Sequence, residues 1–187
     1  MKIKFVIGYV VLLTLSSNWV LGQDSWKIDS SRVVFHISNA GLEVEGIIVG
    51  IIGDIKFSKN KLDKSFFTTT AKTETIQTGI KLRDKHLKKP DYFDIEKYPT
   101  IRIESKEIIK LKNGFESFCT IILKGQTKNI VIPFTFNQTN KKAEFKGAFS
   151  LNRLDFDLGE KSIILSDTVK MGAFQFVVCY YCHAAIA

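Results

Sequence analysis

Apolar and polar residues alternate with a period of two along most of the chain, as in β-strands that bury one face. Val33, Phe35 and Ile37, for example, alternate with more polar or smaller neighbours. Segments of this kind are rich in β-branched and aromatic residues, which favour strands. They cover residues 33–38, 43–48, 55–57, 66–73, 101–104, 118–123, 130–136, 143–151 and 169–178. Turn signals such as Lys124-Gly125 separate them, so about nine extended segments are predicted.

One stretch breaks the alternation. Residues 78–89 contain good helix formers and no β-branched run, and Pro90 disfavours helical geometry at the residue before it. A short helix is therefore predicted there. An all-β chain of this length must stack two sheets or close on itself, and closure removes exposed strand edges. We expect an all-β fold, an antiparallel barrel of about eight strands with one short helix.

The interior of such a barrel can be filled in two ways. Inward Phe, Ile and Val residues can pack into a solid core, or they can line a tunnel around one small ligand. The alternation does not separate these two possibilities, and on its own it favours the packed core.

The N-terminal segment differs from the rest of the chain. Lys2 and Lys4 precede an apolar run over residues 5–15, and small residues follow, as in a secretory signal peptide. We predict a signal peptide over residues 1–22 and a single mature domain over residues 23–187. Its location would then be periplasmic or secreted.

The charge balance is basic but scattered. The chain has 27 Lys and Arg against 19 Asp and Glu, a net charge of +8, and loss of the two lysines in residues 1–22 leaves +6. Such a balance suits an anionic partner or transient contact with a membrane surface, or simply solubility. Without a run of like charges or an RNA-binding signature, no nucleic-acid partner is expected.

Several ordered blocks of sequence carry a family resemblance. They are Trp26–Asp29, Gly50–Phe57, Ile76–Gly79 with Arg83–Leu87, Phe93–Ile101, Leu123–Lys128, Phe149–Phe156 and Leu165–Val169. In this order they resemble the YceI family of exported lipid- or isoprenoid-binding proteins. The chain departs from that pattern after Asp29, where many members carry a His, and at its unusually apolar, cysteine-bearing end.

The resemblance implies a lipocalin-like antiparallel barrel with the short helix near its mouth. It implies that the protein carries or sequesters a long apolar chain, such as a polyisoprenoid or fatty-acid-like lipid. It implies binding rather than turnover, so no enzyme and no cofactor are expected. The oligomeric state is expected to be a monomer or a homodimer.

The candidate ligand-binding residues fall into two groups. Seven are candidate lining residues: Phe35, Ile37, Phe67, Ile101, Ile103, Phe134 and Phe149. Arg83 and His86, in the predicted helix, are candidate contacts for a phosphate or carboxylate head group. The alternative for Arg83 is a structural pairing with neighbours that fixes the helix on the barrel. A one-residue slip in register would exchange lining and solvent positions.

Neither a catalytic nor a metal site is expected. The chain has three His, no G-x-S-x-G elbow and no H-E-x-x-H helix. Asp84, His86, Asp91 and Asp94 match no ligand spacing of a known metal site. Arg153 and Asp155 would share a face of a strand, where we expect them to pair as a structural clamp, the alternative being an Arg153 that contacts ligand.

The C-terminal segment supplies the alternative function. Cys179, Cys182 and His183 form the haem-attachment pattern of c-type cytochromes, which would make the protein a haem-bearing redox protein. In one extended strand, however, the two cysteines would point to opposite faces about 10 Å apart, at ~3.3 Å per residue. A local disulfide between them, or two plain thiols, would also fit the sequence. Cys119 is expected to be a buried free thiol.

Overall fold

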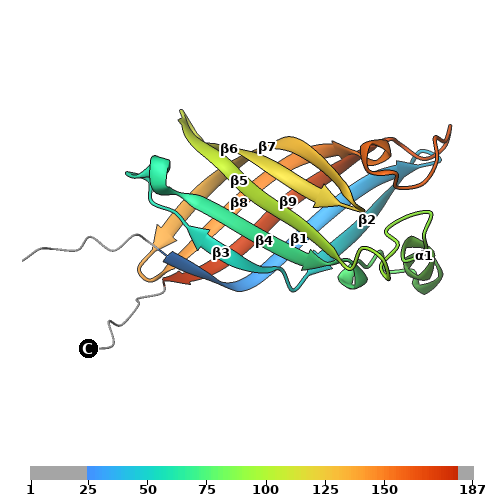
Figure 1. Ribbon diagram of the computed structural model, residues 1–187, viewed down its shortest axis with the longest axis horizontal. Helices are drawn as coiled ribbons and strands as arrows, with labels where there is room; N and C mark the ends of the chain where they lie inside the picture. The colour runs from blue at the N-terminus through green and yellow to red at the C-terminus, as the bar shows by residue number, and fades with distance from the viewer. Residues whose placement is uncertain (1–24, 181–187) are drawn as a thin grey trace, which may run out of the picture.

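The computed structural model describes residues 25–180, and its nine strands form one antiparallel sheet that closes on itself (Figure 1). The strands are β1 (Ser25–Asn39), β2 (Leu42–Val49), β3 (Ile52–Lys56), β4 (Phe66–Lys72), β5 (Thr100–Leu111), β6 (Gly114–Leu123), β7 (Gln126–Thr139), β8 (Lys142–Asn152) and β9 (Thr168–Tyr180). Pairing between β1 and β9 closes the ring. No helix within residues 25–180 is long and apolar enough to cross a membrane.

Strands β2 and β3 share one place in the ring. The C-terminal half of β1 pairs with β2, whereas its first three residues pair with β3. The chain bends between β2 and β3 at Gly50, whose φ of 68° is a conformation that glycine adopts without strain. The prediction of an antiparallel barrel of about eight strands with one short helix is therefore confirmed.

The antiparallel order places alternate connections at opposite ends of the barrel. One end, called the α1 end here, carries the β1–β2 hairpin, the β6–β7 turn and the two long connections (Figure 1). The β4–β5 connection contains the short 3-10 helix η2 (Thr73–Thr75) and α1 (Lys81–Leu87), and the β8–β9 connection contains η3 (Arg153–Phe156). The opposite end carries the β5–β6 and β7–β8 hairpins and the β3–β4 connection with η1 (Leu62–Lys64).

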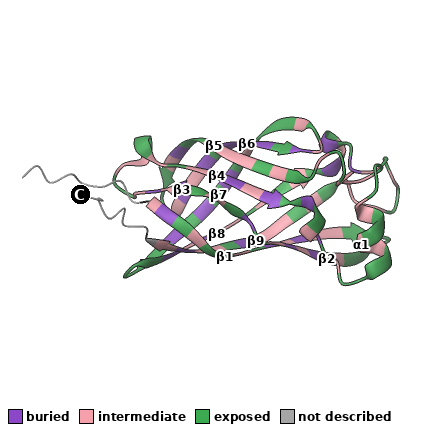
Figure 2. Ribbon diagram, turned by 60° about the horizontal axis from the view of Figure 1, so that its bottom comes forward, coloured by how far each residue is buried: buried purple, intermediate pink, exposed green. Residues whose placement is uncertain are grey.

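The helix is shorter than the predicted 78–89. Thr78 precedes it in non-helical backbone, and Gly79 has a φ of 79°. The Asp84 carboxylate accepts a hydrogen bond of 2.7 Å from the Thr78 backbone N–H, which ties the entry segment to the helix. No residue of α1 is buried, and Figure 2 shows the buried residues along the barrel strands instead.

A cluster of aromatic rings closes the end opposite α1. Phe57, which is 1% exposed, lies 4.7–5.6 Å from four other phenylalanine rings by centroid. These are Phe115, Phe134, Phe136 and Phe145. The Trp26 indole N–H donates a hydrogen bond of 3.0 Å to the Phe57 carbonyl, and its ring contacts Phe136. This end of the barrel is therefore a packed core.

Candidate ligand-binding cavity

A cavity of about 1160 Å³ occupies the barrel between the aromatic cluster and the α1 end. Small-molecule sites commonly enclose roughly 300–1,000 Å³, so this cavity is slightly larger than that range. Phe134 and Phe145 of the aromatic cluster form its floor. The interior is thus divided into a packed half and an open half.

All nine predicted site residues line this cavity. Phe35 and Ile37 come from β1, Phe67 from β4, Ile101 and Ile103 from β5, Phe134 from β7, Phe149 from β8, and Arg83 and His86 from α1. Contact of these side chains with a ligand remains a prediction.

The accessibility of the inward side chains separates a cavity from a packed core. Ile37, Phe67 and Ile103 point into the barrel, yet each stays partly accessible instead of being buried by side chains from across the interior. In a close-packed interior such residues would have no accessible surface. The open half of the barrel is therefore hollow and lined by apolar side chains.

Strand β9 contributes lining residues that the sequence analysis did not predict. Val169 and Met171 line the cavity, and so do Phe174 and Phe176. In a regular strand the odd-numbered pair and the even-numbered pair would point to opposite faces. The register against β8 shifts between Gly147 and Phe149, where β9 has one more residue than β8. This bulge returns the second pair to the inner face. Gly172, inside an alternating strand, is the signal that could have predicted it.

Polar residues gather where the cavity meets the α1 end. They come from the β1–β2 hairpin, from α1 and its flanks, from the β6–β7 turn and from the β8–β9 connection. They include Asn39, Thr78, Arg83, His86, Asp91, Tyr92, Lys124, Asp157, Glu160, Lys161 and Ser162. The cavity thus has an apolar floor and walls and a polar rim, the arrangement that an amphiphile with one polar end would fit.

Arg83 is anchored on the segment before α1 and still has a free guanidinium nitrogen. Its Nε donates to the Thr78 hydroxyl at 2.7 Å, and its Nη2 donates to the Thr78 carbonyl at 2.6 Å. Among the described residues Nη1 has no hydrogen-bond partner. Arg83 and Asp84 both bind Thr78 and do not pair with each other. The structural role and a contact with ligand are therefore compatible.

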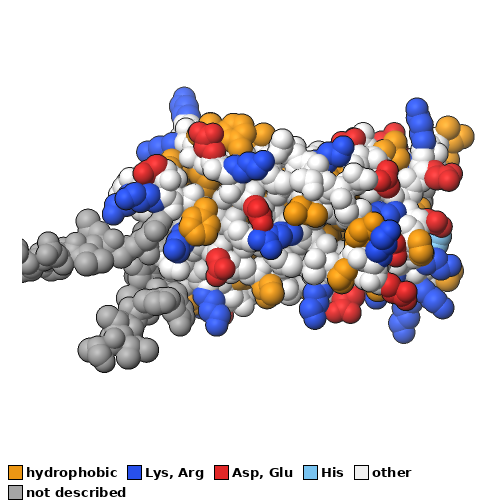
Figure 3. Space-filling model, in the orientation of Figure 1, with side chains coloured by type: hydrophobic (Ala, Val, Ile, Leu, Met, Phe, Trp, Pro, Cys, Tyr) orange, Lys and Arg blue, Asp and Glu red, His pale blue; other side chains and the backbone are white. Residues whose placement is uncertain are grey.

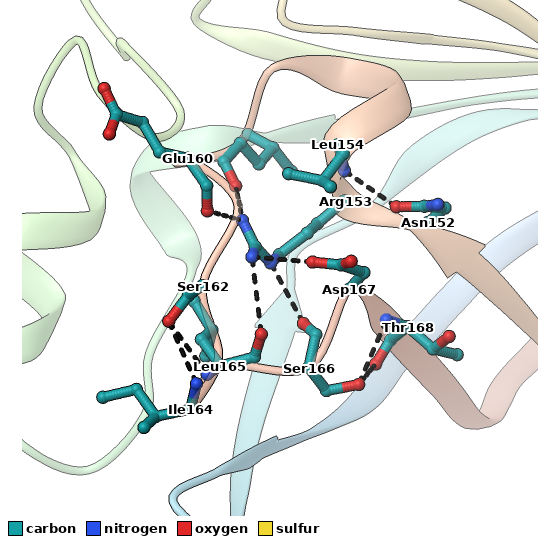
Figure 4. Close-up of polar contacts among 11 residues, drawn as sticks. Asn152, Arg153, Leu154, Glu160, Ser162, Ile164, Leu165, Ser166, Asp167 and Thr168 are labelled. Atoms are coloured by element: carbon teal, nitrogen blue, oxygen red, sulfur yellow. Dashed lines mark hydrogen bonds and ion pairs between the residues drawn. The ribbon is translucent and has the colours of Figure 1, made fainter.

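Arg153 organises the β8–β9 connection from inside (Figure 4). It is 2% exposed, and its Nη1 donates to the carbonyls of Leu158 at 2.9 Å and Glu160 at 2.8 Å. Its Nε donates to the Ser166 carbonyl at 3.0 Å, and its Nη2 pairs with the Asp167 carboxylate at 2.9 Å. One guanidinium therefore fixes both sides of this loop.

The prediction that Arg153 acts as a clamp is correct, but its predicted partner Asp155 is wrong. The pairing was predicted for a continuous strand, in which residues two apart share a face. The chain instead leaves β8 at Asn152 and forms η3, so Asp155 lies exposed on the surface. The carboxylate partner comes from 14 residues along the chain, at Asp167.

The β8–β9 connection is tied to both of its neighbours on the rim. The Gly159 N–H donates to the Asp91 carbonyl, which follows α1, at 2.7 Å. On the other side, the Ala40 N–H in the β1–β2 hairpin donates to the Ile164 carbonyl at 2.7 Å. These bonds hold three connections in one continuous rim.

The two cysteines among the described residues, Cys119 and Cys179, do not line the cavity. Cys119 is a buried free thiol, as predicted; burial raises its pKa to about 11, partly offset by its hydrogen bond to Ser117. Cys179 is half-buried in β9, between Lys27 of β1 and Lys142 of β8. Cys182 and His183 lie outside the described residues, as does the predicted signal peptide. The haem alternative therefore stays a prediction.

Comparisons with known proteins place these features in a family. Residues 26–174 match the model of the YceI-like domain. A relative from Pseudomonas savastanoi pv. phaseolicola, named a UPF0312 protein, is 31% identical over 137 residues, covering 67% of this chain and 70% of the relative.

Solved structures share the fold. The crystal structure of Burkholderia cenocepacia BcnA superposes with a TM-score of 0.75 at 21% identity, covering 79% of this chain and 95% of that one. A polyisoprenoid binding domain from Saccharophagus degradans, implicated in plant cell wall breakdown, has a TM-score of 0.65 at 14% identity. That match covers 86% of this chain and 100% of the other.

Proposed function

The chain belongs to the YceI-like domain family, and on this premise we propose that it is an exported protein that carries or sequesters a long-chain apolar ligand inside its barrel. The ligand class is a polyisoprenoid or a fatty-acid-like lipid. The observation that carries the proposal is the hollow, apolar half of the barrel, with partly accessible inward side chains around about 1160 Å³. The polyisoprenoid-binding activity named for the Saccharophagus degradans domain supports the same ligand class.

Burial of apolar surface supplies the affinity. A lipid chain gains roughly 25 cal/mol for each Å² of apolar surface removed from water. Because the floor and walls of the cavity are apolar, a lipid chain can be held there without any reactive side chain of the protein. We assign binding rather than catalysis to the cavity for this reason. The tail would point to the aromatic floor and the polar end to the rim.

Native mass spectrometry of the mature protein, purified from the extracytoplasmic fraction, tests this function. Mild activation should release an adduct of lipid mass, and the mass would identify the ligand class. An adduct that survives denaturation and absorbs as haem would overturn carriage in favour of the redox alternative. Protein that takes up no lipid even after incubation with one would also contradict the proposal.

A polar substitution inside the cavity should lower lipid retention. Ile103 lines the open half on β5, opposite Thr69 of β4 and Ile121 of β6. In Ile103→Gln an amide faces the lipid tail, and an unsatisfied polar group against apolar surface costs about 1–3 kcal/mol. We expect roughly a tenfold weaker affinity for palmitate, measured by displacement of a fluorescent fatty acid.

The matched control is Ile122→Gln on the neighbouring strand. Ile122 pairs with Arg102 and lies on the outer face, 37% exposed. The affinity of Ile122→Gln for palmitate should stay within about twofold of that of the unmodified protein, as expected for a surface change. Equal losses in the two folded variants would place the lipid outside the barrel.

Arg83 should select ligands with an acidic end. Its Nη1 is available at the rim, and a charge-assisted hydrogen bond contributes about 1.5–3 kcal/mol. Arg83→Met should therefore weaken palmitate binding about tenfold and leave hexadecanol, which has the same chain length, within about twofold. A merely structural Arg83 would weaken both ligands together. Arg102→Met, at a half-exposed arginine on the outer face, is the control and should change neither.

A further inference from the structure

Five large apolar side chains lie exposed on the connections of the α1 end. They are Leu42, Ile80, Leu82, Ile163 and Ile164, exposed by 73%, 53%, 79%, 105% and 58%. Three separate connections supply them: the β1–β2 hairpin, α1 with its preceding residue, and the β8–β9 loop. We call these five residues the rim patch.

Backbone contacts hold these connections around the cavity opening. The β1–β2 hairpin is bonded to the loop at Ile164, and the loop is bonded at Gly159 to the segment that follows α1. The same connections supply the polar residues that line the opening of the cavity. The rim patch therefore lies on the same connections as the polar rim of the cavity.

Lysines are interspersed with the rim patch. Residues 81–89 contain four lysines and Arg83 against one acidic residue, Asp84. The Asp84 carboxylate accepts hydrogen bonds from the backbone N–H and the hydroxyl of Thr78. Lys81, Lys85 and Lys89 are exposed, and none of the lysines in residues 81–89 has an ion-pair partner in the part of the chain that the structure describes. Lys161 precedes the two isoleucines of the loop, separated from Ile163 by one residue. Figure 3 shows hydrophobic and basic side chains at this end, with acidic side chains among them.

We propose that the rim patch docks the barrel on the surface of an anionic phospholipid bilayer, with the cavity opening facing the bilayer. The apolar tips enter the headgroup region while the lysines bind lipid phosphates, the combination typical of interfacial membrane binding. The patch suits a fluid surface better than a protein partner, because its apolar side chains stand on separate tips. A stable protein interface needs a continuous surface of about 800 Å² on each partner.

Docking would let a lipid pass between bilayer and cavity without crossing water. The transfer of lipid rests on the proposed function, whereas the docking itself rests on the rim patch and the lysines near it. The two are separable by experiment, because vesicle binding is measured on the protein without any release or uptake of ligand.

Vesicle flotation tests the docking. The mature protein should float with vesicles of phosphatidylcholine and phosphatidylglycerol and bind those of phosphatidylcholine alone at least tenfold more weakly. Ile163→Asp should reduce binding to the anionic vesicles about tenfold or more, because it removes an apolar tip and adds a negative charge. The double variant Lys85→Gln/Lys89→Gln should bind the anionic vesicles about fivefold more weakly for each lysine removed. Added salt should weaken vesicle binding by the unmodified protein.

Ile52→Asp is the matched control. Ile52 is 68% exposed at the start of β3, on a strand of the barrel wall and outside the connections that carry the rim patch, so vesicle binding by Ile52→Asp should stay within about twofold of the unmodified protein. Equal flotation of Ile163→Asp and Ile52→Asp, both shown to be folded by circular dichroism, would overturn the proposal. So would a dimer of the unmodified protein that Ile163→Asp dissociates in sedimentation velocity, because a second copy would then cover the patch.

The remaining outcomes separate docking from carriage. Protein that floats with anionic vesicles but holds no lipid in native mass spectrometry would leave docking intact and contradict carriage. Protein that holds lipid but does not float would leave carriage intact and overturn docking.

Discussion

Phe57→Ala is expected to lower the free energy of unfolding by about 3–5 kcal/mol, the range for large-to-small changes at buried aromatic residues. Phe57 is 1% exposed and contacts four phenylalanine rings at the end of the barrel opposite α1. Its removal leaves a void among rings held by rigid strands, which collapse only in part. The change would be measured from urea unfolding curves followed by tryptophan fluorescence.

Phe66→Ala provides the matched control for this prediction. Phe66 is 41% exposed at the start of β4 and contacts the Lys56 ammonium 5.4 Å above its ring. Its loss should cost less than about 1 kcal/mol. Similar losses for the two variants would show that the aromatic cluster is not the packed core of the barrel.

Arg153→Met is expected to destabilise the protein by about 3–5 kcal/mol. The substitution keeps much of the side-chain volume but leaves Asp167 without its cation and four loop carbonyls without their donor. Removal of one partner from a buried charged network has costs of this size. Urea unfolding measures the loss of stability, and limited proteolysis should show first cleavage within residues 157–167.

Two further variants test the geometry of this network. Arg153→Lys should recover only part of the loss, because one ammonium cannot donate in the fixed directions of a guanidinium. Arg102→Met removes a half-exposed ion pair with Glu104 and should cost at most about 1 kcal/mol. Full recovery by lysine would contradict the directional role given to Arg153.

Arg153 also shows where reasoning from sequence stops. Its role as a clamp follows from the general need of a buried arginine for a carboxylate. The identity of that carboxylate depends on backbone geometry, because η3 turns Asp155 outwards and the returning loop brings Asp167 to the guanidinium. Spacing along the chain contains no information about a loop that folds back.

Strand β9 shows a second limit. A strict period of two predicts one inner face for the whole strand, but the bulge near Gly172 lets Met171 and Phe174 both face the cavity. A single added residue moves every later side chain of the strand to the opposite face of the sheet. None of the nine candidate residues lies on β9, so the extra residue does not change the face to which they point.

Closure into an antiparallel barrel was one of two arrangements open to an all-β chain, favoured by the removal of exposed strand edges and implied by the resemblance to the YceI family. The sequence by itself determined the all-β class, the position of the helix and the apolar character of the interior. These follow from alternation, turn residues and helix propensity, which act over a few neighbouring residues. Only the tertiary structure decided which part of that interior is solid. Around Phe57 the rings meet across the barrel, whereas the side chains around Ile103 line a cavity. Both halves have the same alternation, and the distance across the barrel is a property of the closed sheet.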